Sequence, residues 1–550
     1  MKGEILENQL DEKTKSLIAE MEKKLDKKDE ELKSKNDEIN NLKNELAYLK
    51  AQLANRNKKI FSSSSEKVDP NQLSLFNEAE KESNSNIKEP VIEEVCYTRK
   101  KPSNNIGKKD NLEGLEKVII EHKLSEEEAI CKECGSPLEI IGVNSTKQVL
   151  KFVPARLYVE EHITYSYACR KCEADNINSN IITTKAPKNL INKGMASNNL
   201  LSHVISLKFL YSVPLYRQEN YFNMLGATLS RQTLSNWVIG VAAELTDIYN
   251  LMKDELLKSN YVQADETTLK VIEHNGNESK AKKYMWLYKT GSSRNSIILY
   301  DYQKTRSSPC PKEFLKGFSG FLQTDGYQGY NKVENVKRVY CLAHIRRKFH
   351  EIVENLSDEA LKNSRAIIGF NYCEQIYKLE KDIREQYGND DDYYQKRYEI
   401  RLEKLSPILE DFEKYINIEI KDALPRSPLG KALEYAQKTV PTMKNILEDG
   451  SLEVDNNAAE RSIKPFVIGR KNWLFANTSK GARASATIYS IIETAKANNL
   501  KIERYLIYLF DNLSNMEIRE KDLLLELMPW SDTIPEELKL KSSKYGVSIK

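Results

Sequence analysis

The stretch YVQADETTLKV at residues 261–271 decides the fold class, because the sequence changes there from helical to strand-like patterning. Residues 282–290, KKYMWLYKT, repeat the pattern, and a GSSRN turn leads into SIILYDYQ at 296–303. Runs rich in β-branched and aromatic residues, separated by turn residues, are typical of strands joined by hairpins. These residues therefore predict a three-stranded antiparallel meander.

Two further strands are predicted after a short helix. The helix is PKEFLKGF at 311–318, and the fourth strand is FLQTDGYQGY at 321–330. The fifth strand begins VKRVYCLAHIRRKFHEIV at 336–353 and runs into a helix. Three antiparallel strands, a crossover helix and more strands are the order of a ribonuclease-H-like sheet. The first part of such a catalytic core would span residues 256–350.

This strand order brings Asp265, in the middle of the first strand, beside Asp325 at the end of the fourth. Two adjacent carboxylates repel each other unless a cation lies between them. Mg²⁺ needs only a few carboxylates plus water and phosphate, and two such ions about 3.5–4 Å apart promote phosphodiester displacement. Two alternatives stay open: Glu266 faces the other side of the same strand, and Asp325 could be a turn residue before Gly326.

A third acid is expected in VDNNAAERSIKPF at 454–466. An acid or amide at 455–457 can cap a helix, which would place Glu460 near the first turns. Pro465 should end or kink that helix. Glu460 is therefore the candidate third carboxylate, with Asp455 as its rival. A surface ion pair between Glu460 and Lys464 at i+4 is the plainer alternative.

A basic run follows this helix start. Residues 461–483 contain no acid, and Trp473 and Phe475 lie among their cations. Basic residues interleaved with aromatic ones suit a phosphate backbone and unstacked bases, although an ordinary solvated face is the alternative. The candidate DNA contacts are Arg461, Lys464, Arg470, Lys471, Lys480 and Arg483, together with Arg346 and Arg347 of the CLAHIRRKF stretch. His344 of that stretch is by default a structural histidine, with a place near the scissile phosphate as the alternative.

Four of the eight cysteines form two CxxC pairs, Cys131 with Cys134 and Cys169 with Cys172. Four thiolates suit tetrahedral Zn²⁺ and leave no open position, so the zinc would be structural. The intervening KQVLKFVPARLYVEEHITYSYAC at 147–169 reads as strands. We therefore predict a zinc-ribbon domain over residues 111–185, with inert thiols as the alternative.

The N-terminal residues 1–60 carry a heptad pattern, because Ile18, Leu25, Leu32, Ile39, Leu46 and Leu53 recur at a spacing of seven. Such a seam must meet another helix, which predicts a self-associating coiled coil rather than a single solvated helix. Residues 61–110 are polar and poor in apolar residues, which indicates a flexible linker.

The remaining segments read as helices. Residues 195–255 would form either a helix-turn-helix around Gly226 or a plain helical connector. Residues 351–450 read as a helical insertion, residues 451–500 as the second part of the catalytic core, and residues 501–550 as a C-terminal helical tail.

The composition agrees with a multidomain chain without membrane spans. The 550 residues are too many for one core, and 30% are charged. No apolar run of a membrane-spanning length and no signal-like N-terminus occurs, so we expect a cytoplasmic protein. The net charge of +3 neither supports nor excludes nucleic-acid binding.

Several motifs in one order resemble transposases of the insertion-sequence-66 family, of the TnpC type. They are ADETTLKV, LQTDGYQGYN, CLAHIRRKF, VDNNAAERSIKPFVIGRKNWLF and LMPW at 527–530. The resemblance implies a ribonuclease-H-like core with an Asp-Asp-Glu triad, which corresponds here to Asp265, Asp325 and Glu460. It also implies Mg²⁺ or Mn²⁺, DNA as partner at the element ends and at the target, and small accessory proteins.

The predicted function is therefore a DNA transposase that cleaves the ends of an insertion sequence and joins them to target DNA. A related nuclease or resolvase that cuts without joining is one alternative. A catalytically silent DNA-end-binding protein is the other.

Overall fold

The computed structural model describes residues 20–21, 23–32, 35, 155–167, 182–192, 194–272, 282–291, 295–354, 356 and 364–540. The chain divides into two compact units, Met1–Arg156 and Leu157–Lys550. In the first unit, residues 23–32 are helical, as the heptad pattern predicts. None of the described helices is long and apolar enough to span a membrane.

A five-stranded sheet lies at the centre of the second unit, with the strand order β5-β4-β3-β6-β7. β3 (Tyr261–Leu269) is its middle strand, and β4 (Lys283–Thr290) and β5 (Ile298–Gln303) continue it as an antiparallel meander. β6 (Gly320–Thr324) pairs parallel with β3, and β7 (Val336–Tyr340) pairs parallel with β6. The predicted strand order is therefore confirmed.

The fourth strand is shorter than predicted. β6 ends at Thr324, and the 3-10 helix η3 (Gln328–Lys332) takes up the end of the predicted strand. Its start is fixed by Gly320, where φ is +147° and a Cβ would lie 2.3 Å from the Asn260 carbonyl oxygen. Only glycine fits such a close approach, and the short helix α9 (Pro309–Phe314) makes the crossover from β5. The crossover and the glycine together set the register of β6 against β3.

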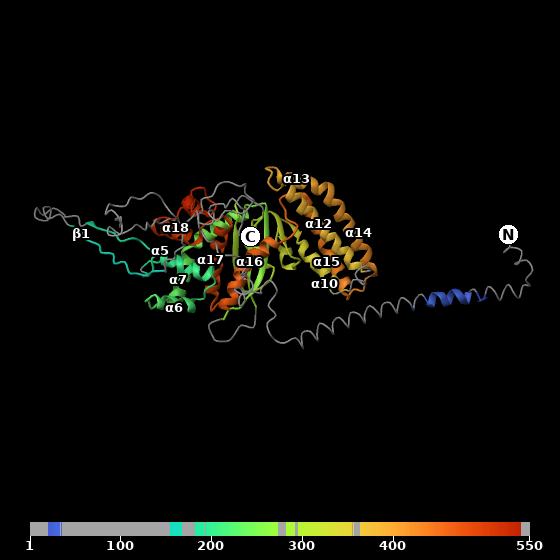
Figure 1. The fold of residues 1–550 in the computed structure, drawn as a ribbon, viewed down its shortest axis with the longest axis horizontal. Helices are drawn as coiled ribbons and strands as arrows, with labels where there is room; N and C mark the ends of the chain where they lie inside the picture. Colours follow the sequence, from blue (N-terminus) through green and yellow to red (C-terminus); the bar gives the residue numbers. More distant parts are fainter. Residues whose placement is uncertain are drawn as a thin grey trace, which may run out of the picture. The chain divides into compact units, whose positions relative to one another are not determined.

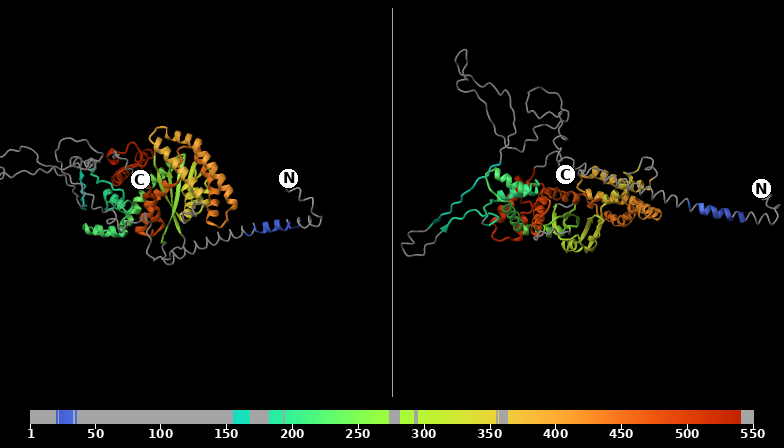
Figure 2. Two further views of the ribbon diagram at one scale, coloured as in Figure 1. Left: turned by 45° about the vertical axis from the view of Figure 1, so that its right-hand side comes forward. Right: turned by 90° about the horizontal axis from the view of Figure 1, so that it is seen from below.

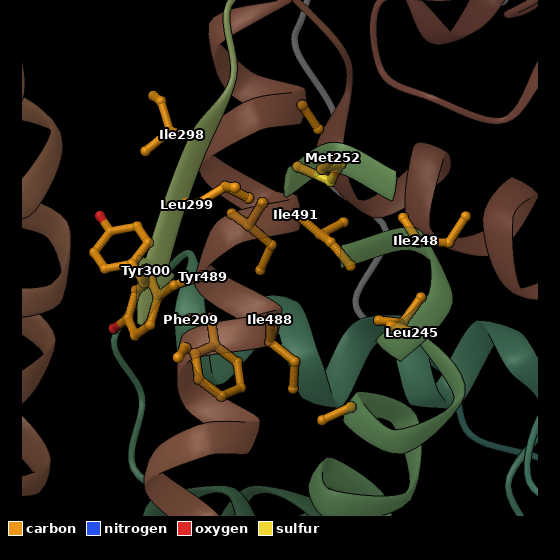
Figure 3. Packing of buried hydrophobic residues seen from close by; sticks show 14 of the residues in the cluster. Phe209, Leu245, Ile248, Met252, Ile298, Leu299, Tyr300, Ile488, Tyr489 and Ile491 are labelled. Carbon is orange, nitrogen blue, oxygen red and sulfur yellow. The ribbon is translucent and has the colours of Figure 1, made fainter. Parts of the chain in front are cut away.

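Helix α17 (Ser479–Ala497) covers the edge strand β5 with both hydrogen bonds and apolar side chains. The Ser490 hydroxyl accepts from the Tyr300 backbone N–H at 2.8 Å, and the Thr494 hydroxyl accepts from Ile298 at 2.9 Å. Figure 3 shows Ile488 and Ile491 of this helix packed between the strand and the neighbouring helices. An edge strand covered in this way is protected from pairing with another chain.

The helices on the α17 side of the sheet share this core. They are α5 (Asn198–Phe209), α6 (Leu215–Met224), α7 (Arg231–Glu244), α8 (Thr246–Leu257) and α18 (Ile502–Asn515). Gly226, with φ at +91°, makes the turn between α6 and α7. The C-terminal segment continues through α19 (Lys521–Glu526), and Met528 is buried in the same core. The predicted C-terminal helices therefore contribute to the core.

The helical insertion forms a second core on the other side of the sheet (Figures 1 and 2). It consists of α12 (Arg365–Tyr387), α13 (Tyr393–Ile400), α14 (Ser406–Asp422) and α15 (Pro428–Met443), and these pack with α10 (Leu342–Val353). Arg397 and Arg401 are fully buried there, and both pair with Glu380. Buried charges of this kind need complete pairing, so they fix how α12 meets the following helices.

Two expectations are wrong in detail. Residues 155–165 form no strand, and within 155–167 and 182–192 only Ser166–Tyr167 (β1) and Ile182–Thr183 (β2) pair. Of the two outcomes expected at Pro465, an end or a kink, the end does not occur, because α16 runs from Asn457 to Trp473.

Candidate active site

Asp265 and Asp325 are brought together by the pairing of β3 with β6. The last paired residues are Gln263 and Gln323, so each acid lies two residues beyond the same point. Asp265 remains on β3, while Asp325 directly follows β6 and accepts the Tyr327 backbone N–H at 2.9 Å. The predicted proximity of the two acids follows directly from this register.

Glu460 joins them from the first turns of α16. The preceding Asn456 is buried and ties the start of this helix to the sheet. Its side-chain amide donates to the Ala264 carbonyl oxygen at 2.8 Å, and its backbone N–H donates to Cys341 Sγ at 3.1 Å. Since Ala264 precedes Asp265 on β3, these bonds hold the helix carrying Glu460 against the strand carrying Asp265.

The pKa of the Asp265 carboxyl reflects its burial and the charges of the nearby acids. Burial, above all, raises the pKa of the Asp265 carboxyl to about 7. The charge of Glu266 raises this pKa further, the backbone N–H of Glu266 partly opposes the rise, and the charges of Glu460 and Asp325 add to it. In the described part of the chain, no lysine or arginine forms an ion pair with Asp265 or Glu460, whereas Arg306 lies 4.0 Å from Asp325. The site therefore concentrates negative charge that a bound cation would offset.

The two acids that the sequence leaves as alternatives, Glu266 and Asp455, already bond other groups of the protein. The side chain of Glu266 is only 2% exposed, pairs with Arg306, and accepts the Tyr330 hydroxyl at 2.5 Å. Asp455 accepts the Tyr377 hydroxyl at 3.0 Å and two N–H groups of Asn457. Both carboxylates thus have protein partners.

His344 and Cys341 lie beside Glu460, a neighbourhood that the CLAHIRRKF stretch hints at without specifying. Cys341, His344 and Glu460 each offer one ligand atom within 4.8 Å of the others. His344 Nδ1 is 3.9 Å from Glu460 Oε1 and has no hydrogen-bond partner among the described atoms. Burial, and next the charge of Arg347, lower the pKa of His344, so the imidazole is neutral.

Cys341 is a poor metal ligand in this setting. Burial raises the pKa of its thiol to about 12, and its sulfur already accepts the Asn456 N–H. Metals bind the thiolate rather than the thiol. The carboxylates of the site fit a hard divalent cation better than the cysteine does.

Some of the cations predicted to contact DNA are exposed, and others bond residues within the protein. Arg461, Lys464 and Lys471 are exposed on α16, Lys480 and Arg483 on α17, and Arg347 on α10. Arg470 instead bonds Thr267 and Thr268 of β3, and Arg346 pairs with Glu374.

Trp473, expected among the DNA-contacting aromatics, is also engaged inside the protein. Its ring lies edge-on to Phe466, with the ring centroids 5.6 Å apart, and beneath the Lys208 ammonium group at 5.4 Å. The ring therefore packs at the end of α16. The four predicted zinc ligands, Cys131, Cys134, Cys169 and Cys172, lie outside the described residues.

Comparisons with known proteins find relatives that match most of the chain. Uncharacterized protein y4jD of Sinorhizobium fredii (strain NBRC 101917 / NGR234) is 29% identical over 75% of this chain and 79% of its own length. Uncharacterized protein y4qI of the same strain is 28% identical over 71% of this chain and 70% of its own length.

Three family models match consecutive parts of the chain. Residues 48–120 match the model described as "Transposase C of IS166 homeodomain", a range that includes the whole predicted linker, 61–110. Residues 128–173 match the zinc-finger binding domain of transposase IS66, which supports structural Zn²⁺. Residues 193–484, more than half of the chain, match the model of the transposase IS66 family. The chain therefore belongs to the transposase IS66 family.

Proposed function

We propose that this chain is the catalytic transposase of its element and that Asp265, Asp325 and Glu460 are its catalytic acids. The observation that carries the proposal is the meeting of three acids from β3, the end of β6 and α16. The strand order and helical insertion also support a ribonuclease-H-like core.

The three carboxylates would hold one or two divalent cations, Mg²⁺ or Mn²⁺. Burial is the main cause of the raised pKa of Asp265, and the charges of Glu460 and Asp325 add to it; a bound cation would offset these charges. Metal ions at such a site activate an attacking oxygen and stabilise the leaving oxygen of a phosphodiester.

The protein's own groups would orient this chemistry. Asn456 fixes the start of α16 against β3, so Glu460 stays in place. Neutral His344, within 3.9 Å of Glu460, can accept a proton at Nδ1 or donate one, depending on its tautomer. The exposed cations of α16 would contact the phosphates flanking the cleaved bond.

The other parts of the chain would recognise and pair the element ends. The zinc-finger domain and the α6–α7 pair are the candidate end-recognition parts. The polar start of α7, including Arg231, Gln232 and Asn236, lines a hollow together with Asn477. Polar side chains at the start of a second helix suit contacts to base edges, which favours the helix-turn-helix interpretation. The heptad segment would hold two subunits together.

A strand-cleavage and joining assay tests the acids. DNA carrying the element ends is incubated with Mg²⁺ or Mn²⁺ and with wild type, Asp265→Asn, Asp325→Asn or Glu460→Gln. Each substitution should lower cleavage by about a thousandfold or more, since the metal contribution is several kcal/mol, while DNA binding persists.

A matched control is Asp301→Asn, which removes a half-buried acid from the edge strand β5, outside the site. That variant should remain active. Full activity of Glu460→Gln would contradict the triad. Cleavage without any joined product would identify a nuclease in place of a transposase.

A further inference from the structure

Helix α16 ends in a strained turn that the proposed chemistry does not use. Leu474 has φ +64° and ψ −46°, a conformation that bulky side chains rarely adopt. The Phe475 N–H donates to the Trp473 carbonyl oxygen at 2.8 Å, which closes a three-residue γ-turn in its rarer, strained form. Strain of this kind persists only where the surroundings enforce it, and it concentrates at functional sites.

The surroundings enforce this turn from both sides. Before it, the Leu474 N–H donates to the Arg470 carbonyl oxygen at 2.7 Å. After it, Ala476 donates to Lys270 at 3.0 Å and accepts from Ile272 at 2.9 Å, which attaches the chain to the extension of β3. The turn is therefore held in one conformation by the sheet.

The turn presents apolar side chains to solvent instead of burying them. Leu474 is 64% exposed and Phe475 is 36% exposed. We call these two residues the apolar turn. A glycine would adopt this backbone without strain, so the leucine at this position points to a use for its side chain.

The apolar turn continues a basic face of α16. Glu460, Lys464, Ile468 and Lys471 are spaced by four, four and three residues, so they lie along one side of the helix. No acidic residue occurs between Glu460 and Glu493. A partner of this surface must therefore carry both negative charge and apolar faces, which describes the phosphates and bases of DNA.

The distance along α16 would set the position of the contact on a DNA duplex that runs parallel to the helix. The helix runs beside β3 in the same direction, because Asn456 bonds Ala264, Arg470 bonds Thr267, and Ala476 pairs near Val271. At about 1.5 Å per residue, Leu474 lies about 21 Å beyond Glu460. At about 3.4 Å per base pair, this corresponds to roughly six base pairs.

We propose that the apolar turn, Leu474 and Phe475, contacts DNA bases about six base pairs from the bond that is cleaved, and opens a base step there. Leucine and phenylalanine are among the side chains that insert between base steps, and the neighbouring Lys464 and Lys471 would hold the adjacent phosphates. The position rests on the proposed function, because it is counted from Glu460.

The test places the fluorescent base 2-aminopurine, one position at a time, at base pairs 4 to 8 from the cleavage site in end DNA. Binding of the wild-type protein without added Mg²⁺ or Mn²⁺ should raise fluorescence severalfold at one step, because unstacking relieves quenching. The double variant Leu474→Gly with Phe475→Ala should reduce this signal to that of free duplex. Its affinity for DNA should fall less than the signal does.

The variants are chosen so that a change in fluorescence does not come from unfolding of the protein. Leu474→Gly relieves the strain at φ +64°, so the turn should survive while its side chain is lost. The control Ile418→Ser removes another exposed apolar side chain, 61% exposed on α14, and should leave the signal unchanged.

The outcomes separate this proposal from the catalytic one. A wild type that cleaves DNA but gives no fluorescence change at any of the five positions would overturn the apolar turn alone. A wild-type signal that the double variant preserves would also overturn it. A changed molecular mass of the double variant in light scattering would then show that the apolar turn contacts another copy of the protein. Activity of Glu460→Gln would remove the triad without affecting the fluorescence readout.

Discussion

Two adjacent acids of β3 have opposite environments, although the sequence treats them alike. Asp265 has no lysine or arginine as an ion-pair partner among the described residues, whereas Glu266 is bonded by Arg306 and Tyr330, which lie 40 and 64 residues further along the chain. The charge of Asp325 acts on both acids. Strand alternation predicts that the two side chains point to opposite faces, but it does not say which face holds the site. The choice depends on partners that only the folded chain brings together.

The raised pKa of Asp265 predicts how stability changes with pH. The folded-state pKa of about 7 lies above the ordinary value of about 3.9 in an unfolded chain. Between these values the folded state binds more protons, so this group lowers the free energy of unfolding as pH rises from about 4 through 7. Asp265→Asn abolishes that loss, and its Oδ1 can still accept the Glu266 N–H.

Asp265→Asn should therefore unfold at a temperature several degrees above wild type at pH 8, without divalent cations. The difference should shrink toward pH 4, where the wild-type carboxyl becomes protonated in both states. Thermal unfolding followed by circular dichroism at both pH values measures it. A difference that is equal at both pH values would contradict the assigned pKa.

At the scale of elements, strands and helices follow from apolar patterning, but the length of α16 does not. A proline inside a helix costs about 3 kcal/mol relative to alanine, so the sequence favours an end at Pro465. The structure continues because Ile463 and Phe466 on either side are buried, and the Tyr300 hydroxyl donates to the Ser462 carbonyl oxygen. Tertiary packing outweighs local propensity here.

The junction before α16 predicts a positioning role for Asn456. Asn456→Ala removes the bond to the Ala264 carbonyl oxygen and should let the start of the helix shift. A displacement of about 1 Å can cost roughly a hundredfold in rate, so kcat for cleavage should fall about tenfold to a hundredfold. DNA affinity should stay unchanged, since Asn456 is only 1% exposed.

Asn457→Ala is the matched control, because the Asn457 side chain bonds only Asp455 among the described residues. Single-turnover cleavage and a binding titration separate the two effects. If Asn456→Ala lowered affinity as much as kcat, its role would be general stability of the fold and not the placement of Glu460.

At the scale of the whole molecule, the order of parts is readable from the sequence, while their packing is not. Heptads, paired cysteines, strand patterns and charged helical patterns each have their own period or spacing, so each part can be recognised separately in the sequence. The packing of α18 against α5, in contrast, cannot be read from the sequence. It depends on Asn198 bonding Asp511 across 313 residues, a contact that no local pattern contains.

The N-terminal segment supplies the prediction at this scale. Leu25 and Leu32 are 63% and 62% exposed on a described helix, one heptad apart. Apolar residues in such a seam are buried when a second helix pairs with it. Replacing both with aspartate in the full chain should destabilise the paired state by more than the roughly 2–5 kcal/mol that a leucine-to-alanine change costs, because charges also enter the seam.

Light scattering should then show Leu25→Asp with Leu32→Asp as a single copy at concentrations where wild type is paired. The variant should still bind one element end, because the proposed DNA contacts lie beyond residue 60, but it should fail to hold two ends in one complex. Lys27→Glu, an exposed change on the same helix outside the heptad rows, should leave both properties intact. A double variant that retains the wild-type mass and pairs ends normally would place subunit pairing elsewhere in the chain.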